Sequence, residues 1–147
     1  MKILKATKEH VSEVAQLFDS YRQFYECEPD IEIAKLYISE RIQNNESTIF
    51  LADDNGEKTG FVQMYPSFCS IDLTKIYILY DLYVVHNSRN SGVGALLMNR
   101  ATEHAKEHGA SRIDLMTAFS NKPGQYLYEK LGYKRVLEDF YSYSLQV

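Results

Sequence analysis

The residues best suited to chemistry lie in a short polar turn over residues 89–95. Gly92 and Gly94 stand close together in this turn, and apolar residues at helical spacing follow from Val93 onward. A helix N-terminus presents unpaired backbone N–H groups with a partial positive charge, and glycines let a phosphate approach that backbone. The turn therefore predicts an anion site built from Arg89, Asn90, Ser91, Gly92, Val93, Gly94 and Ala95.

The segment before this turn carries an acidic residue in an apolar run. Residues 81–85 read Asp-Leu-Tyr-Val-Val, which is the composition of a buried strand. An unpaired carboxylate inside such a strand is unfavourable, so Asp81 is expected to have a partner or a function. Two interpretations stay open: a base or amine anchor, or a structural carboxylate paired with a buried N–H group or an arginine.

Two common phosphate-binding motifs do not fit the turn. A P-loop has Lys and then Ser or Thr after its last glycine, where this chain has Ala95 and Leu96. A dinucleotide-binding fingerprint has a third glycine three residues on, where this chain has Leu97. The sequence therefore disfavours both kinds of nucleotide site.

The pattern Arg-x-x-Gly-x-Gly after a strand resembles the coenzyme A pyrophosphate loop of the GNAT family of N-acetyltransferases. Residues 121–133 resemble a second segment of that family, Asn-x-x-Ala-x-x-Leu-Tyr-x-x-x-Gly-Phe/Tyr, at unchanged spacing. Gly124 replaces the usual alanine, which should loosen this helix slightly. The resemblance covers residues 75–147 well and the N-terminal half by layout alone. It implies an enzyme that uses acetyl-CoA.

The resemblance also implies roles for individual residues. Tyr128 matches the tyrosine that acts as general acid near the coenzyme sulfur; its alternative is a core tyrosine. The backbone of Leu82 and Val84 would pair with the pantetheine arm like a partial extra strand, with Tyr83 between them in the coenzyme site and the Val84 N–H donating to the thioester oxygen. Asn121 would contact pantetheine or phosphate, cap its helix, or do both. The expected coenzyme site comprises residues 82–84 and 89–95 with Asn121, Gly124 and Tyr128.

The acceptor side of the expected site is acidic and aromatic. In the GNAT family the loop between the first two helices borders the acceptor pocket, and here it carries Tyr25, Glu26 and Glu28. Such residues suit an ammonium group, although a run of acids is also typical of a solvated face. Many members carry Glu or His one position before Asp81, where this chain has Tyr80. The base is therefore Asp81 or a water chain, and all five residues are predicted to bind the acceptor.

The expected reaction is transfer of an acetyl group from acetyl-CoA to a primary amine by direct attack in a ternary complex. The stretch over residues 76–84 also resembles a yeast subgroup that acetylates polyamines and histone lysines, which favours a polyamine, a small amine or a lysine side chain. A competing interpretation is a sensor or regulatory module that binds acetyl-CoA and transfers little. Turnover with a broad amine panel distinguishes the two.

The elements that must position these residues follow from hydrophobic periodicity. We expect strands over residues 2–6, 48–52, 60–65, 76–85, 113–117, 133–136 and 140–145, with residues 66–73 as a connection. Helices are expected after Thr7 and Asp30, from Val93 to Gly109, and over residues 121–131. The order is βααβββαβαββ: an α/β layered domain over residues 1–147, whose mixed, mostly antiparallel sheet has six to seven strands.

Composition limits the other possibilities. The net charge of −4 argues against general nucleic-acid binding, and no run reaches membrane-spanning length or forms a signal-peptide core. Cys27 and Cys69 are far apart and are expected to be reduced thiols, so a cytoplasmic protein is predicted. His104 and His108 are one turn apart, which we assign to an exposed helix face with no metal. The aromatic segment over residues 140–145 suggests a homodimer contact.

Overall fold

The computed structural model describes residues 1–136 and 139–147 and divides into two compact units, residues 1–116 and 117–147. The larger unit is built on a five-stranded sheet in the order β1-β2-β3-β4-β5. Neighbouring strands are antiparallel except β4 and β5, which are parallel. The predicted α/β class and mixed, mostly antiparallel sheet are confirmed. The strands are β1 (Lys2–Lys5), β2 (Thr48–Asp54), β3 (Glu57–Cys69), β4 (Thr74–Val84) and β5 (Ala110–Asp114).

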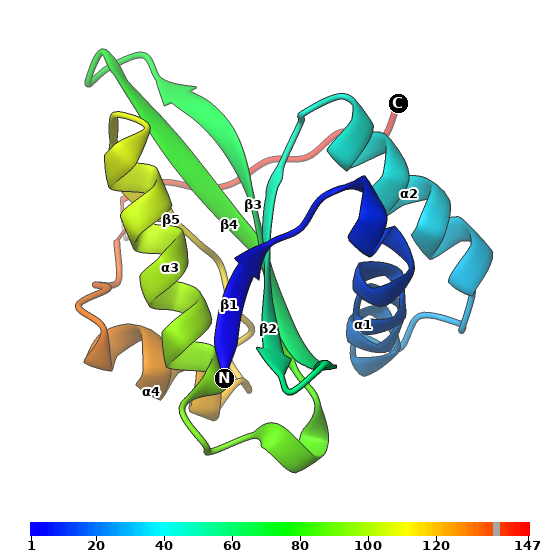
Figure 1. The fold of residues 1–147 in the computed structure, drawn as a ribbon. Helices are drawn as coiled ribbons and strands as arrows, with labels where there is room; N and C mark the ends of the chain where they lie inside the picture. The colour runs from blue at the N-terminus through cyan, green and yellow to red at the C-terminus, as the bar shows by residue number, and fades with distance from the viewer. Residues whose placement is uncertain (137–138) are drawn as a thin grey trace. The chain divides into compact units, whose positions relative to one another are not determined.

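Helices cover both faces of this sheet. In Figure 1, α1 (Val11–Phe24) and α2 (Ile31–Gln43) lie against one face, which we call the α1 face. The helix α3 (Val93–Glu107) covers the opposite one, the α3 face. Two 3-10 turns, η1 (Lys8–His10) and η2 (His86–Ser88), lead into α1 and α3.

Two polar side chains set the starts of the first helical segments. The Thr7 hydroxyl accepts a hydrogen bond from the Glu9 N–H at 3.4 Å, so it caps η1 rather than α1 itself. Asp30 Oδ1 accepts from the Ile33 N–H at 3.1 Å at the start of α2. Each side chain satisfies a backbone donor that a helix start leaves unpaired.

The two faces pack differently against their helices. On the α1 face, the Phe61 ring meets Phe18 and Tyr21 edge-on, with ring centroids 6.3 and 6.1 Å apart. On the α3 face, a Cβ at Gly60 would lie 2.8 Å from the Tyr83 carbonyl oxygen and 3.2 Å from Leu97 Cδ1. Glycine therefore lets α3 come close to the sheet at this point.

The hairpin of β3 and β4 is longer than predicted. Residues 66–69, expected to be part of a connection, continue β3 and pair with β4 as far as Cys69 opposite Thr74. Pro66 is tolerated there because β2 pairs with β3 only as far as Met64, which leaves β4 as the strand partner of the extension. The predicted connection over residues 66–73 is therefore wrong for residues 66–69, which belong to β3.

The smaller unit contains one regular element, α4 (Lys122–Lys130), in its described residues. The strands predicted over 133–136 and 140–145 are wrong: the described residues there form no ladder, and Tyr141 and Tyr143 are both 91% exposed. An alternation of side-chain types can predict an extended segment. A β-strand, however, also needs a neighbouring strand to pair with its backbone N–H and C=O groups. The sheet therefore has five strands, not six to seven, and the predicted order is wrong in its last two members.

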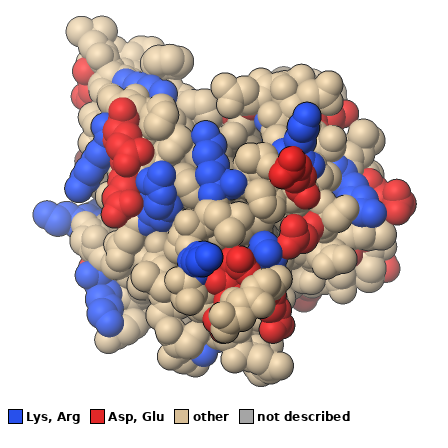
Figure 2. All heavy atoms as spheres, viewed as in Figure 1, with Lys and Arg blue, Asp and Glu red and all other residues tan. Residues whose placement is uncertain are grey.

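Charged residues on the face shown in Figure 2 are interspersed, with Lys and Arg close to Asp and Glu. Lys58 Nζ lies 2.9 Å from Glu13 and 3.4 Å from Asp53. Arg100 lies 3.6 Å from Glu103 on the same helix. Charges here are therefore balanced locally.

Candidate active site

The centre of β4 carries a bulge at Tyr80. Gln63 of β3 pairs with Asp81, whereas the next residue, Met64, pairs with Leu79, so Tyr80 is the extra residue on β4. A bulge leaves its extra residue outside the regular ladder. Here the Tyr80 carbonyl oxygen accepts a hydrogen bond from the Tyr21 hydroxyl at 3.2 Å, and the Tyr80 side chain is 62% exposed.

Asp81 lies beside this bulge and is buried, with 3% of its surface exposed. Gln63 Nε2 donates to Asp81 Oδ2 at 2.6 Å, and Gln63 Oε1 accepts from the Ser47 hydroxyl at 2.7 Å. Burial raises the pKa of the Asp81 carboxyl, while hydrogen bonds from Gln63 and Tyr21 act in the opposite direction. The Asp81 carboxyl therefore binds a proton more readily in this site than it would in water.

Two tyrosines face Asp81 from neighbouring elements. Burial, followed by the Asp81 charge, raises the pKa of the Tyr21 hydroxyl on α1. Burial and a hydrogen bond with Tyr37 raise the pKa of Tyr65 on β3, whose hydroxyl lies 2.7 Å from that of Tyr37. Both phenols therefore remain protonated at neutral pH and can donate. Sequence reasoning missed Gln63 and Tyr21, because only the register at the bulge brings them to Asp81.

An open backbone edge follows Asp81 along β4. Within residues 1–116, β5 pairs with β4 only over Lys75 to Ile78, so residues 82–84 have no strand on that side. The Val85 N–H donates toward β3, to the Thr59 carbonyl oxygen at 2.9 Å. Because successive amides of a strand point to opposite sides, the Val84 N–H faces the open edge. This edge can accept an extended ligand.

The open edge leads into the predicted anion turn. Gly92 caps α3 in the left-handed conformation (φ 88°), and among the described residues no side chain caps this helix start. Asn90 is also left-handed (φ 61°), and the Ser91 hydroxyl donates to the Ser88 carbonyl oxygen. The first backbone N–H groups of α3 are thus available to an anion. The turn formed by residues 89–95 has the geometry that the sequence predicted.

The Arg89 side chain points back toward the strand. Its Nε donates to the Val84 carbonyl oxygen at 2.9 Å. Its guanidinium lies 5.7 Å from the Phe24 ring centroid and 5.6 Å from that of Tyr83. Arg89 therefore ties the anion turn to both β4 and the end of α1.

The predicted acceptor residues separate into two groups. Tyr25 packs edge-on against Tyr21, with ring centroids 5.1 Å apart, and so joins the aromatic residues near Tyr80 and Asp81. Glu26 and Glu28 are exposed and form no ion pair in the described part of the chain. Their loop is held by a buried residue that the sequence did not reveal. That residue, Asp19, accepts from the Asp30 N–H and from Gln23 Nε2, each at 3.0 Å.

The smaller unit holds the remaining predicted residues. Asn121 caps α4: its Oδ1 accepts from the Gly124 N–H at 3.2 Å, and its Nδ2 donates to the Thr117 hydroxyl at 2.9 Å. A Cβ at Gly124 would lie 2.4 Å from Asn121 Nδ2, so glycine makes room for this cap. Tyr128 is half-buried, with its ring centroid 6.0 Å from that of Tyr133.

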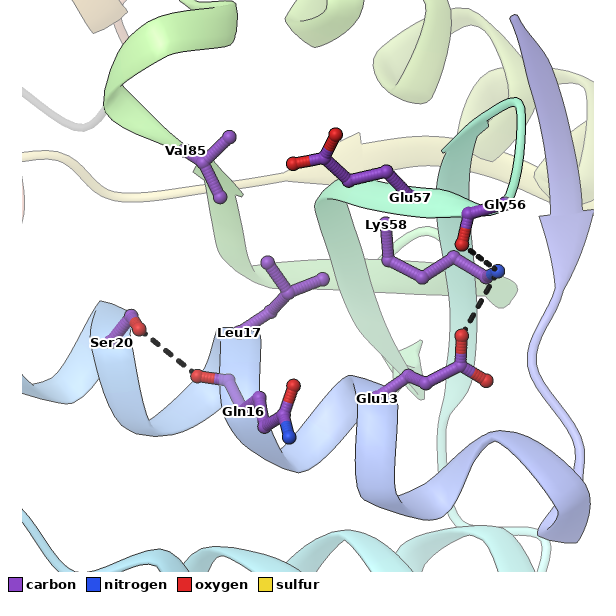
Figure 3. A pocket seen from close by; sticks show the side chains of 8 residues that line it. All are labelled: Glu13, Gln16, Leu17, Ser20, Gly56, Glu57, Lys58 and Val85. Carbon is purple, nitrogen blue, oxygen red and sulfur yellow. Dashed lines mark hydrogen bonds and ion pairs between the residues drawn. The ribbon is translucent and has the colours of Figure 1, made fainter.

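A hollow of about 400 Å³ opens between α1, the β2–β3 turn and the end of β4 (Figure 3). Its wall includes the ion pair of Lys58 with Glu13, and the Lys58 ammonium also donates to the Gly56 carbonyl oxygen at 3.4 Å. None of the predicted catalytic or binding residues lines it; Val85 and Ser20 are its members nearest to them in the sequence. This hollow is therefore distinct from the candidate site.

The histidine pair on α3 corrects one prediction. His104 is 4% exposed, not on an exposed face, and its Nε2 lies 3.2 Å from the Thr48 hydroxyl and 3.4 Å from that of Tyr77. Alternating charges on α3 hid the fact that His104 points into the sheet. Nitrogen and oxygen atoms of His104, Glu107 and His108 lie within 4.8 Å of one another. The two rings are stacked 3.8 Å apart at 22°, however, so one ion cannot lie in both ring planes.

Comparisons with known proteins agree with this geometry. The model of the acetyltransferase (GNAT) family matches residues 13–133, so the chain belongs to that family. It is 39% identical to the uncharacterized N-acetyltransferase YhfO of Bacillus subtilis over 91% of this chain and 90% of that protein. A crystal structure of a probable acetyltransferase is 36% identical, with a TM-score of 0.92, over 100% of this chain and 98% of that one.

A more distant solved structure shares the fold. The crystal structure of a predicted acetyltransferase from Clostridium acetobutylicum with acetyl-CoA has a TM-score of 0.79 at 17% identity, over 97% of this chain and 95% of that one. Members of the GNAT family bind acetyl-CoA, and this chain is an acetyl-CoA-dependent acyltransferase. In the described part of the chain, no helix combines the length and apolar character needed to span a membrane.

Proposed function

We propose that this chain transfers the acetyl group of acetyl-CoA to a primary amine by direct attack within a ternary complex. The observation that carries the proposal is the open edge of β4 at residues 82–84, which runs from buried Asp81 to the glycine-capped start of α3. That edge offers an extended pantetheine arm backbone partners, and the helix start offers N–H groups to a pyrophosphate.

Each part of the coenzyme has proposed partners. The backbone groups of Leu82 and Val84 face the open edge and pair with the pantetheine arm, with Tyr83 between them, and the Val84 N–H donates to the thioester oxygen as negative charge develops there. Residues 89–95 hold the pyrophosphate through backbone N–H groups. The family resemblance supports Asn121, Gly124 and Tyr128 of the smaller unit as further proposed coenzyme-binding residues.

The proposed chemistry moves two protons. An alkylammonium has a pKa of about 10.4, so its proton must leave before the nitrogen attacks the thioester carbon. Asp81 accepts that proton, and Tyr80, Tyr25, Glu26 and Glu28 border the acceptor. As the new C–N bond forms and the C–S bond breaks, Tyr128 gives its hydroxyl proton to the leaving thiolate. The nitrogen loses its second proton to solvent as it becomes an amide, and a proton from solvent restores the Tyr128 hydroxyl.

Steady-state kinetics with two varied substrates test this proposal. Acetyl-CoA is paired with a panel that contains spermidine, α-blocked lysine amide and glycinamide, and released thiol and acetylated amine are both quantified. Intersecting reciprocal plots with a turned-over amine support a ternary complex. Parallel plots would contradict direct attack. Binding of acetyl-CoA without acetylation of any amine would favour the sensor interpretation.

Tyr128→Phe tests the general acid. We expect turnover to fall by about 10²-fold, because the leaving thiolate loses its proton donor, while the dissociation constant of coenzyme A stays nearly unchanged. Tyr126→Phe is the matched control, since Tyr126 lies two residues earlier on α4 and is 71% exposed. Equal turnover in wild type and Tyr128→Phe would remove the role.

The finer assignments also form part of the proposal. The resemblance of residues 76–84 to the yeast polyamine- and histone-acetylating subgroup favours a polyamine or an exposed lysine as acceptor. We propose that residues 1–147 act as one catalytic domain, in the cytoplasm and as a homodimer that uses residues 140–145, where Phe140 is 73% exposed. Sedimentation equilibrium tests the dimer; a monomer mass at every concentration would contradict it.

A further inference from the structure

Asp81 is well placed to accept a proton but poorly placed to touch a substrate. Its carboxyl belongs to a residue that is 97% buried, and Gln63, which holds Oδ2 at 2.6 Å, has no exposed surface at all. A direct hydrogen bond between an acceptor amine and this carboxyl would require the surrounding side chains to move. A proton that leaves the amine therefore needs a group that reaches both the surface and Asp81.

Tyr21 meets this requirement. Its hydroxyl donates to the carbonyl oxygen of the bulged Tyr80 at 3.2 Å, which places it beside the next residue, Asp81, whose carboxyl is a second acceptor within its influence. Tyr21 is half-buried, and its ring is fixed by edge-on contacts with Phe61 and Tyr25. One hydroxyl proton can turn between the two acceptors, while the oxygen keeps a lone pair for a third group.

The other titratable groups around Asp81 are less suited to this task. The Tyr65 hydroxyl on β3 already forms a hydrogen bond of 2.7 Å with the Tyr37 hydroxyl, and the Arg41 guanidinium lies over the Tyr37 ring. Tyr80 stands on the same strand as Asp81, but its side chain is 62% exposed and packs on the Tyr65 ring. Gln63 cannot titrate, and it orients the carboxyl through its link to Ser47.

We infer that Tyr21 carries the proton from the acceptor amine to Asp81, with Gln63 as a positioning residue for the carboxylate. The inference rests on the proposed function. As the amine nitrogen releases its proton to the Tyr21 oxygen, the Tyr21 hydroxyl proton passes to the Asp81 carboxylate. The ammonium becomes a neutral amine, Asp81 becomes a neutral acid, and Tyr21 ends as it began. The same path in reverse returns the proton to solvent after transfer.

The test compares Tyr21→Phe with wild type on two amines of different basicity at pH 7.5. An α-blocked lysine amide, with a pKa of about 10.4, is almost entirely charged, whereas glycinamide, with a pKa of about 8, is already partly neutral. We expect kcat/KM to fall by about 10²-fold for the lysine and by less than tenfold for glycinamide. Tyr77→Phe, which removes a hydroxyl on the α3 face, is the control and should leave both values unchanged.

Equal losses on both amines would overturn the inference, because a merely structural defect does not depend on the basicity of the acceptor. A second measurement does not depend on activity. If wild type acetylates neither amine, the proposed function is contradicted, but the contact between Tyr21 and Asp81 can still be tested. The Asp81 carboxyl is titrated by carbon-detected NMR and assigned by its absence in Asp81→Asn. Loss of the Tyr21 hydrogen bond should raise the pKa of Asp81, and so should Gln63→Leu. An unchanged titration in Tyr21→Phe would show that the contact is not made.

Discussion

The two faces of the sheet each bury one titratable side chain, and the two differ in what surrounds it. On the α1 face, burial raises the pKa of Asp81. On the α3 face, burial, followed by the charge of His108, lowers the pKa of His104 to about 4. In both cases the low-dielectric interior favours the neutral form. At neutral pH a free histidine is already mostly neutral, so burial does not oppose its usual form. A free aspartate is ionised at this pH, so burial opposes its usual form.

The partners of the two groups differ. His104 contacts Thr48 of β2 and Tyr77 of β4, both buried, so it joins α3 to the sheet. Asp81 contacts Tyr21, which reaches the surface, and lies beside a bulge and an open strand edge. A buried side chain that is neutral at neutral pH, such as His104, is typical of a structural role. A buried carboxylate with a perturbed pKa beside a partly exposed side chain, such as Asp81, is a candidate for a functional role.

The largest expected effect is on catalysis by Asp81→Asn. We expect kcat/KM to fall by about 10²- to 10⁴-fold at pH 7.5, because the amide cannot accept the amine proton. The free energy of unfolding should not fall, since the substitution removes a charge that burial disfavours. Assays with acetyl-CoA and urea unfolding measure the two effects. A loss of stability that matches the loss of activity would place Asp81 with His104 as a structural group.

His104→Gln should give the opposite result. Glutamine retains a donor toward Thr48 but leaves a gap beside Phe50 and Tyr77, so we expect a loss of about 2 kcal/mol at pH 7.5 with activity little changed. In wild type, the unfolded chain binds a proton at His104 near pH 6.5 and the folded chain only near pH 4. Stability present above pH 6.5 should therefore decline as the pH falls toward 4.

Urea titrations across this pH range measure that decline. In His104→Gln the part of the slope that comes from this residue should disappear. An acid slope that is the same in both proteins would show that other groups produce it.

A smaller effect is expected where α3 approaches the sheet. Gly60→Ala places a Cβ 2.8 Å from the Tyr83 carbonyl oxygen, which must shift, so we expect a loss of about 1–2 kcal/mol in unfolding free energy. Gly109→Ala is a useful comparison, because a Cβ there meets nothing within 4 Å and tests only the left-handed backbone. Unchanged stability of Gly60→Ala would show that the α3 face is less tightly packed than the contacts indicate.

The smallest effect concerns the exposed acids near the end of α1. Replacing Glu26 and Glu28 by Gln should raise the KM of a polyamine about two- to fivefold, since exposed charge pairs contribute about 0.2–1 kcal/mol. Asp30 should not be used for this test, because it caps α2. No change in KM for any amine would assign the two carboxylates to a solvated face and leave recognition to the buried residues.

The sequence predicted the strand–turn–helix geometry around residues 89–95 well because its signals are local. Strand composition up to Val84, two glycines and the helical spacing after Val93 depend on near neighbours, and the structure places all three as expected. The free thiols of Cys27 and Cys69 are likewise confirmed. The family resemblance rested on this same local pattern.

The predictions that failed depend on distant partners. The last two strands lack a ladder in the described residues, and no pattern within residues 133–136 or 140–145 could report that. His104 looked exposed because its neighbours on α3 are charged, yet β2 and β4 enclose it. Tyr21 is one of 12 tyrosines, and only the bulge at Tyr80 brings it to Asp81.

The measurement that tests this account most directly is the pH profile of kcat/KM for wild type and Asp81→Asn with one acetylated amine. The account predicts an acid limb in wild type at a pH above the ordinary carboxyl range of about 4, because burial raises the pKa of Asp81. In Asp81→Asn this limb should be absent, and the rate should instead rise steadily toward the pKa of the amine. Profiles of the same shape and height in both proteins would contradict the claim that Asp81 accepts the proton.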